Sequence, residues 1–189
     1  MTDGTEQMDG RQGNGWRIAG WSTVAGLILL PWIAMQLTKE VNWTAFDFVA
    51  FGGLLVGLGV ILEIVVWKAR SLAYRAGVGL ALLAVFLLLW ATGAVGIIGS
   101  EDNPANALFL GVMAVAFVGA VIARFRAAGM ARAMLAAAGT QVLVCAFALA
   151  RGAGGEEASW PWDLMVATAV FAGLWSLSAG FFLKAAQKP

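Results

Sequence analysis

The chain has 189 residues, of which 61% are hydrophobic and only 12% are charged, whereas soluble domains carry about 25% charged residues. A soluble domain of this length could not bury so much apolar surface in one core, so the composition favours a protein embedded in a bilayer. The net charge of +1 gives no concentrated basic face for nucleic acid. No histidine is present, which removes the usual haem ligand, the commonest zinc ligand and the commonest general base.

Six apolar stretches follow one another along the chain. Each is near or above the ~20 residues that a helix needs to cross the hydrocarbon core, and none alternates as a β-barrel strand would. We therefore predict an all-α, polytopic transmembrane helix bundle of six spans, arranged as three hairpins. The third stretch is the longest and is expected to tilt or bend near Gly93, Gly96 and Gly99. The stretches run over residues 16–37, 46–67, 72–98, 104–125, 130–150 and 162–183.

Basic residues lie in alternate loops. Only Lys39 and Arg151 fall on one side, and the other ten of the twelve fall in the N-terminal tail, the second loop, the fourth loop and the C-terminus. Under the positive-inside rule, both termini are then cytoplasmic. The predicted organisation is a disordered cytoplasmic tail over residues 1–15, a six-helix membrane domain over residues 16–185 and a short cytoplasmic tail over residues 186–189.

Small residues spaced by four line several of the stretches. They form one face each on the second, fourth and sixth stretches, where helix backbones can approach closely. Two interpretations stay open, namely packing within one bundle and association with a membrane-protein partner or a second copy. The residues are Gly53 and Gly57, then Ala116 and Ala120, then Ala172, Ser176 and Gly180.

Glu63 is the costliest residue to place in a membrane. It lies four positions before Trp67, about one helical turn inside the interface, and must be paired, neutral or hydrated. We expect either an ion pair with Arg70 or Arg75, or a carboxylate that couples proton or cation movement. In the second case Gln36, Thr92 and Gln141 would line a polar path with it, although threonine also bonds to its own helix backbone.

The densest polar cluster runs from Gly99 to Asn106. Gly99 suits the end of a helix, Asn103 is a good N-cap, and Pro104 suits the first helical position. The cluster also holds Glu101, Asp102 and Asn106, and carboxylate and amide oxygens are ligands that Ca²⁺ or Mg²⁺ prefers. The four residues Glu101, Asp102, Asn103 and Asn106 are therefore a candidate ligand or contact site, with capping as the alternative.

No catalytic pattern, metal-ligand spacing or cofactor motif stands in the apolar stretches, so we expect neither an enzyme nor a bound cofactor or metal. The single cysteine, Cys145, lies within an apolar run and is expected to be a buried, unreactive thiol.

Two stretches, VNWTAFDF at residues 41–48 and AVGIIGSEDNPAN at residues 94–106, resemble segments of a family of small, uncharacterised six-helix proteins of the bacterial inner membrane. The resemblance implies a plasma-membrane location and transfers no activity. Together with the loops, which are too short for a soluble domain, it favours an accessory or interaction protein of that membrane. The alternative is a small-solute or ion transporter that uses Glu63 and the polar residues of the spans.

Overall fold

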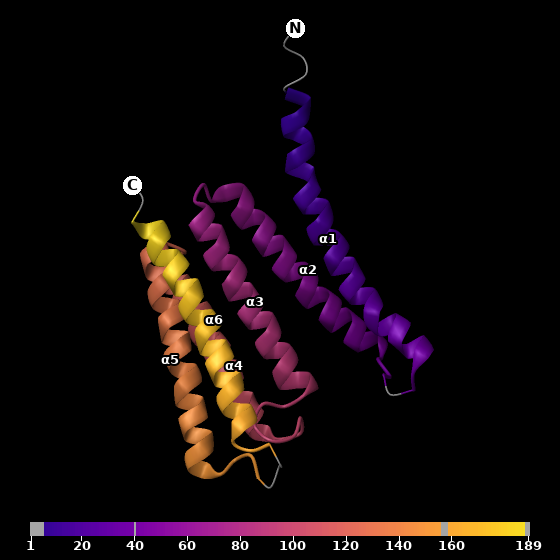
Figure 1. Cartoon of the computed structure of the whole chain (residues 1–189), viewed down its shortest axis with the longest axis vertical. Coiled ribbons are helices and arrows are strands. Elements are labelled where there is room, and N and C mark those ends of the chain that lie inside the picture. Colours follow the sequence, from indigo (N-terminus) through magenta and orange to yellow (C-terminus); the bar gives the residue numbers. More distant parts are fainter. Residues whose placement is uncertain (1–5, 40, 156–158, 188–189) are drawn as a thin grey trace. The chain divides into compact units, whose positions relative to one another are not determined.

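A computed structural model describes residues 6–39, 41–155 and 159–187. These residues form six α-helices and one short 3₁₀ helix, and the described part of the chain contains no strand (Figure 1). All six helices are long and apolar enough to cross a membrane, as expected for a multi-pass membrane protein. The helices are α1 (Glu6–Leu37), α2 (Ala45–Lys68), α3 (Leu72–Ala94), η1 (Pro104–Ala107) with α4 (Leu108–Ile122), α5 (Ala127–Arg151) and α6 (Trp162–Ala186).

Two boundaries differ most from those predicted. Helix α1 begins at Glu6, so residues 6–15 of the expected tail are helical, while residues 1–5 lie outside the described part. Helix α3 ends at Ala94 instead of Ile98, because Gly96 takes a φ of +79° and its N–H donates to the Ala91 carbonyl. The predicted third span is therefore too long at its C-terminal end. The reason is that an apolar run of residues does not show where the backbone leaves the helix.

The chain divides into two compact units, which we call the two-helix unit (residues 1–67) and the four-helix unit (residues 68–189). In the two-helix unit, three pairs of residues bring α1 and α2 together. Ile28 lies against Gly52, Trp21 lies against Gly59, and Arg17 pairs with Glu63. The residue numbers of each pair sum to 80, which is the constant register of an antiparallel helix pair.

The start of α2 is fixed by a reciprocal cap. The backbone N–H and hydroxyl of Thr44 donate to Oδ2 of Asp47 at 2.7 and 2.8 Å, and the Asp47 N–H donates back to the Thr44 hydroxyl at 3.4 Å. These bonds satisfy amide groups that a helix N-terminus otherwise leaves unpaired.

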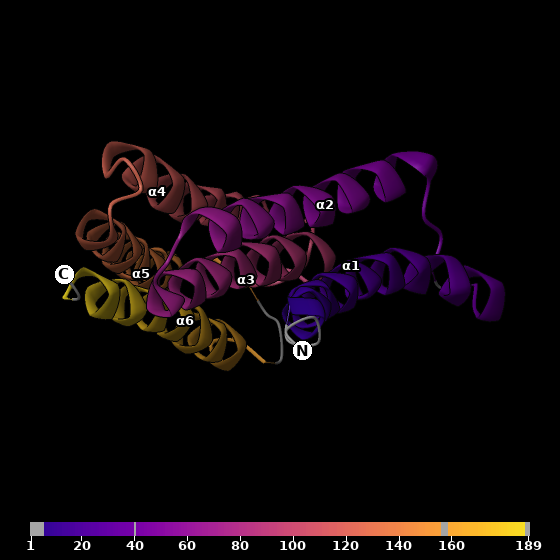
Figure 2. The same cartoon turned by 90° about the horizontal axis from the view of Figure 1, so that it is seen from above.

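In the four-helix unit, α6 packs against both α3 and α5, and α5 packs in turn against α4 (Figures 1 and 2). Helix α3 therefore has its main partner in α6, not in α4, which follows it in the sequence. The core contains the fully buried side chains of Trp175, Phe109, Phe182, Leu88 and Leu164. In the apolar part of α5, 44% of the residues are buried, whereas 6% are buried in the corresponding part of each of α1 and α2.

One end of the four-helix unit is closed by contacts between α3, α6 and the α4–α5 turn. The Ser178 hydroxyl donates to the Gly77 carbonyl at 2.7 Å, and the Phe182 ring occupies the space that a side chain at Gly77 would need. The Tyr74 hydroxyl donates to the Phe125 carbonyl at 2.7 Å. That turn is strained, because Arg124 and Phe125 both have positive φ, so the bond from Tyr74 holds a costly backbone conformation in place.

Candidate functional site

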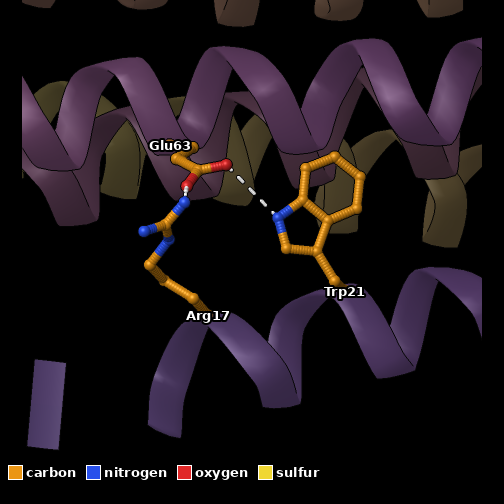
Figure 3. A network of polar contacts seen from close by, with 3 residues as sticks. All are labelled: Arg17, Trp21 and Glu63. Carbon is orange, nitrogen blue, oxygen red and sulfur yellow. Dashed lines mark hydrogen bonds and ion pairs between the residues drawn. The ribbon is translucent and has the colours of Figure 1, made fainter. Parts of the chain in front are cut away.

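Glu63 is held between α1 and α2 by two partners on α1 (Figure 3). Its Oε1 forms an ion pair with the Arg17 guanidinium, and its Oε2 accepts a hydrogen bond from Nε1 of Trp21 at 3.2 Å. The Arg17 side chain is 52% exposed and the Glu63 side chain 28%. The carboxylate is therefore paired, as its depth requires, but it is not sealed from its surroundings.

The partner of Glu63 differs from the one expected. Sequence reasoning placed Arg70 or Arg75 opposite Glu63, whereas the structure uses Arg17, and the Arg75 Nε donates to the Ala69 carbonyl at 2.8 Å. A usable signal was present in the sequence. The turn between the first two spans centres near residue 41, and reflection of residue 63 about that point leads to residue 19, midway between Arg17 and Trp21.

Gln36 lies at the other end of the same pair of helices. It is exposed and sits one residue before the end of α1 at Leu37. It lies nineteen positions after Arg17, which at 1.5 Å per residue is about 28 Å along α1. Gln36 and Glu63 therefore do not share one local site.

The other two residues of the predicted polar path belong to the four-helix unit. The Thr92 hydroxyl donates to the Leu88 carbonyl of its own helix at 2.6 Å. Gln141 is fully buried on α5, and neither its amide nitrogen nor its amide oxygen has a hydrogen-bond partner among the described residues. The four path residues are thus divided between the two units, and among the described residues no hydrogen bond joins any two of them.

Sequence reasoning missed two further polar groups in that core. The Thr168 hydroxyl and the Trp175 indole N–H, seven residues apart on one face of α6, are also buried without a described partner. Helix α5 packs against α6. If the two helices run antiparallel about the loop that joins them, Gln141 on α5 lies at a height between Thr168 and Trp175 on α6. Buried polar groups without partners are costly, and three of them gathered on two packed helices mark this core as unusual.

The α3–α4 loop is organised by Asn106. Its side-chain oxygen accepts from the backbone N–H groups of Ile97 and Ile98 at 2.9 and 2.8 Å, and its side-chain nitrogen donates to the Ser100 carbonyl at 2.9 Å. Asn106 is only 4% exposed, and both isoleucines are buried. The side chain therefore satisfies the backbone N–H groups of two buried residues, which would otherwise be unpaired.

Asn103 caps η1 and also joins two loops. Its side-chain oxygen accepts from the Ala105 N–H at 3.0 Å, which confirms the predicted cap, and its side-chain nitrogen donates to the Ala153 carbonyl at 2.7 Å. Glu101 and Asp102 are exposed beside it. Both asparagine oxygens of the candidate cation site are thus engaged with backbone amides, and the two carboxylates are left on the surface.

No group of three or more histidine, cysteine, aspartate or glutamate side chains is placed to hold a metal ion among the described residues; Glu156 and Glu157 lie outside them. Cys145 is buried and free, at 8% exposure.

The small-residue faces differ in whether another helix covers them. Ala116 and Ala120 on α4 are buried, and Gly119 beside them lies against Ala133 of α5, so this face packs within the chain. By contrast, a Cβ at Gly53, Gly57 or Gly180 would meet no described atom within 4 Å. The faces on α2 and α6 are therefore open within their own units.

Comparison with protein families, with curated proteins and with solved structures finds no match to this chain. The resemblance of residues 41–48 and 94–106 to a bacterial membrane family stays a prediction.

Proposed function

We propose that this chain is an accessory or interaction protein of the bacterial plasma membrane, with six spans, both termini in the cytoplasm and a binding role instead of a catalytic one. Its six apolar helices, the ten-to-two division of basic residues and the two signature-like segments support this proposal. The observation that carries it is the open small-residue face of α6, because small residues let a second helix approach closely in a membrane.

Two stripes divide the open side of α6. Small residues at helical spacing form one stripe, Gly173, Ser176 and Gly180, and bulky residues form the other, Val166, Val170, Leu177 and Phe181. The buried residues Phe171, Trp175 and Phe182 face the opposite way, toward the core. The bulky stripe suits contact with lipid chains, and the small stripe suits contact with a helix.

Adjacent positions at one depth test this proposal. In a Cys145→Ala background, Gly180→Cys places a thiol on the small stripe and Phe181→Cys places one on the bulky stripe. Oxidative or photoactivated cross-linking in native membranes should capture a second copy or one reproducible membrane protein from residue 180 and not from residue 181. Equal capture at both positions, or none at residue 180, would contradict a helix-binding role for this face.

Orientation is tested separately. A reporter active only in the cytoplasm, fused after Arg126, should give a signal, and the same reporter fused after Glu101 should not. A cytoplasmic signal at Glu101 would reverse the proposed topology.

A second candidate is an ion or small-solute transporter, which three buried polar side chains without a described partner favour, namely Gln141, Thr168 and Trp175. Purified protein in liposomes loaded with a pH- or cation-sensitive dye should then show flux that Glu63→Gln abolishes while helix content is retained. Flux equal to that of empty liposomes would rule out the transporter and leave the interaction role as the remaining proposal.

A further inference from the structure

A cavity of about 530 Å³ opens beside the Arg17–Glu63 pair in the two-helix unit. Opposite charges form part of its wall, and apolar side chains form the rest. Its lining consists of Arg17, Val60, Glu63, Ile64, Val66 and Trp67. A ligand that fits must therefore offer both polar and apolar groups.

The polar part of the cavity is neutral overall but strongly dipolar. The guanidinium of Arg17 carries five N–H donors and the carboxylate of Glu63 has about four acceptor positions, so one mutual ion pair and one bond from Trp21 leave capacity on both groups. Both side chains are accessible, Arg17 more than Glu63. A ligand that uses this capacity presents an anion to Arg17 and a cationic donor to Glu63.

The cavity lies near the end of a helix long enough to span a membrane. Glu63 precedes the last residue of α2, Lys68, by five positions, which is about 7.5 Å along the axis. Trp67 lines the cavity and is 82% exposed, as an indole at the headgroup level of a bilayer would be. Val60 and Ile64, about one turn apart on α2, form part of the apolar wall of the cavity, and both side chains are exposed.

We propose that this cavity binds the headgroup of a zwitterionic phospholipid with a primary ammonium group, phosphatidylethanolamine. The phosphate accepts hydrogen bonds from the Arg17 guanidinium, the ammonium donates to the Glu63 carboxylate, and the first part of the acyl chains lies on Val60 and Ile64. Phosphatidylcholine has the same charges but no ammonium N–H to donate. Phosphatidylglycerol carries the same phosphate charge but has no cation to pair with Glu63. This inference rests on the two-helix unit spanning a membrane and is independent of the partner proposed for α6.

Native mass spectrometry of the full chain in detergent, with the three lipids added at equal mole fraction, measures retained lipid directly. We expect phosphatidylethanolamine to be retained about tenfold more than either competitor, as the gain of a charge-assisted hydrogen bond implies. Soluble glycerophosphoethanolamine should not displace it, because that molecule lacks the chains that contact Val60 and Ile64. Equal retention of all three lipids, or displacement by the soluble headgroup at equal concentration, would overturn the assignment.

Variants locate the bound lipid. Glu63→Gln keeps the shape of the cavity and should reduce retention of phosphatidylethanolamine to that of phosphatidylcholine, while Arg17→Gln should lower retention of both. Asp47→Asn, near the other end of α2, is the matched control and should keep the tenfold preference. Circular dichroism checks that each variant is folded before its lipid retention is compared. A preference that survives in folded Glu63→Gln protein would place the lipid elsewhere and defeat the proposal.

Discussion

The two units of this chain hold their helices together by different means. In the four-helix unit, α6 packs between α3 and α5, and side chains bond to backbone groups near both ends, at Gly77 and at Ala153. In the two-helix unit, the described contacts follow one line of side chains, which ends at the half-exposed pair of Arg17 and Glu63. Apolar surface alone therefore does not decide how firmly membrane helices associate, because lipid is as apolar as the helices.

The largest effect is expected in the loop of the four-helix unit. Asn106→Ala leaves the buried N–H groups of Ile97 and Ile98 without acceptors, and each unsatisfied group costs about 1–3 kcal/mol. The free energy of unfolding should therefore fall by about 2–6 kcal/mol in a denaturant titration of the detergent-solubilised protein. Asn103→Ala, in the same loop, is the control and should cost less, about 1–2 kcal/mol for one cap and one loop bond. Asn106→Ala protein as stable as wild type would show that the loop is not structural.

The second prediction concerns the polar groups inside the same core. Gln141→Leu removes an amide with no described partner and should raise the free energy of unfolding by about 1–3 kcal/mol. Thr168→Val removes an unpartnered hydroxyl at nearly constant shape and should act in the same direction. Thr92→Val, whose hydroxyl bonds to Leu88, should instead be neutral or slightly destabilising. Loss of stability in Gln141→Leu would indicate that the amide makes a polar contact needed for folding.

The third prediction concerns the two-helix unit. A double-mutant cycle of Arg17→Gln and Glu63→Gln should give a coupling energy of about 0–1 kcal/mol, because the pair is partly exposed. The measurement is unfolding in detergent, followed with a probe placed on α1. A coupling energy near 3–5 kcal/mol would show that the pair is desolvated and that this unit is as firmly held as the other.

The smallest effect is expected at the surface carboxylates of the α3–α4 loop. The double substitution of Glu101→Ala and Asp102→Ala should change the free energy of unfolding by no more than about 0.5 kcal/mol, because both side chains are exposed and the asparagine oxygens already serve the backbone. Millimolar Ca²⁺ or Mg²⁺ should shift the melting temperature of wild type and variant equally. A stabilising shift in wild type that the double variant loses would identify a cation site.

Residue order predicted the helices well where the physical requirement is local. A bilayer demands about 20 apolar residues per span, so runs such as residues 46–67 and 162–183 correspond closely to α2 and α6. The caps at Thr44 and Asn103 also follow from neighbouring residues. The end of α3 did not, because Ile97 and Ile98 are as apolar as a helix interior, and only Asn106, eight or nine residues later, lets their backbone be buried outside a helix.

The sequence by itself determined that this chain has six apolar helices, because hydropathy and length are properties of each segment alone. Only the tertiary structure decided which polar groups meet. It paired Glu63 with Arg17 and Trp21, and it engaged Asn103 and Asn106 in bonds to the backbone. It left Gln141, Thr168 and Trp175 buried in one core without a partner among the described residues. Such pairings depend on the depth and facing of side chains on different helices. Those quantities are set by how helices dock, which the order of residues along any one helix does not contain.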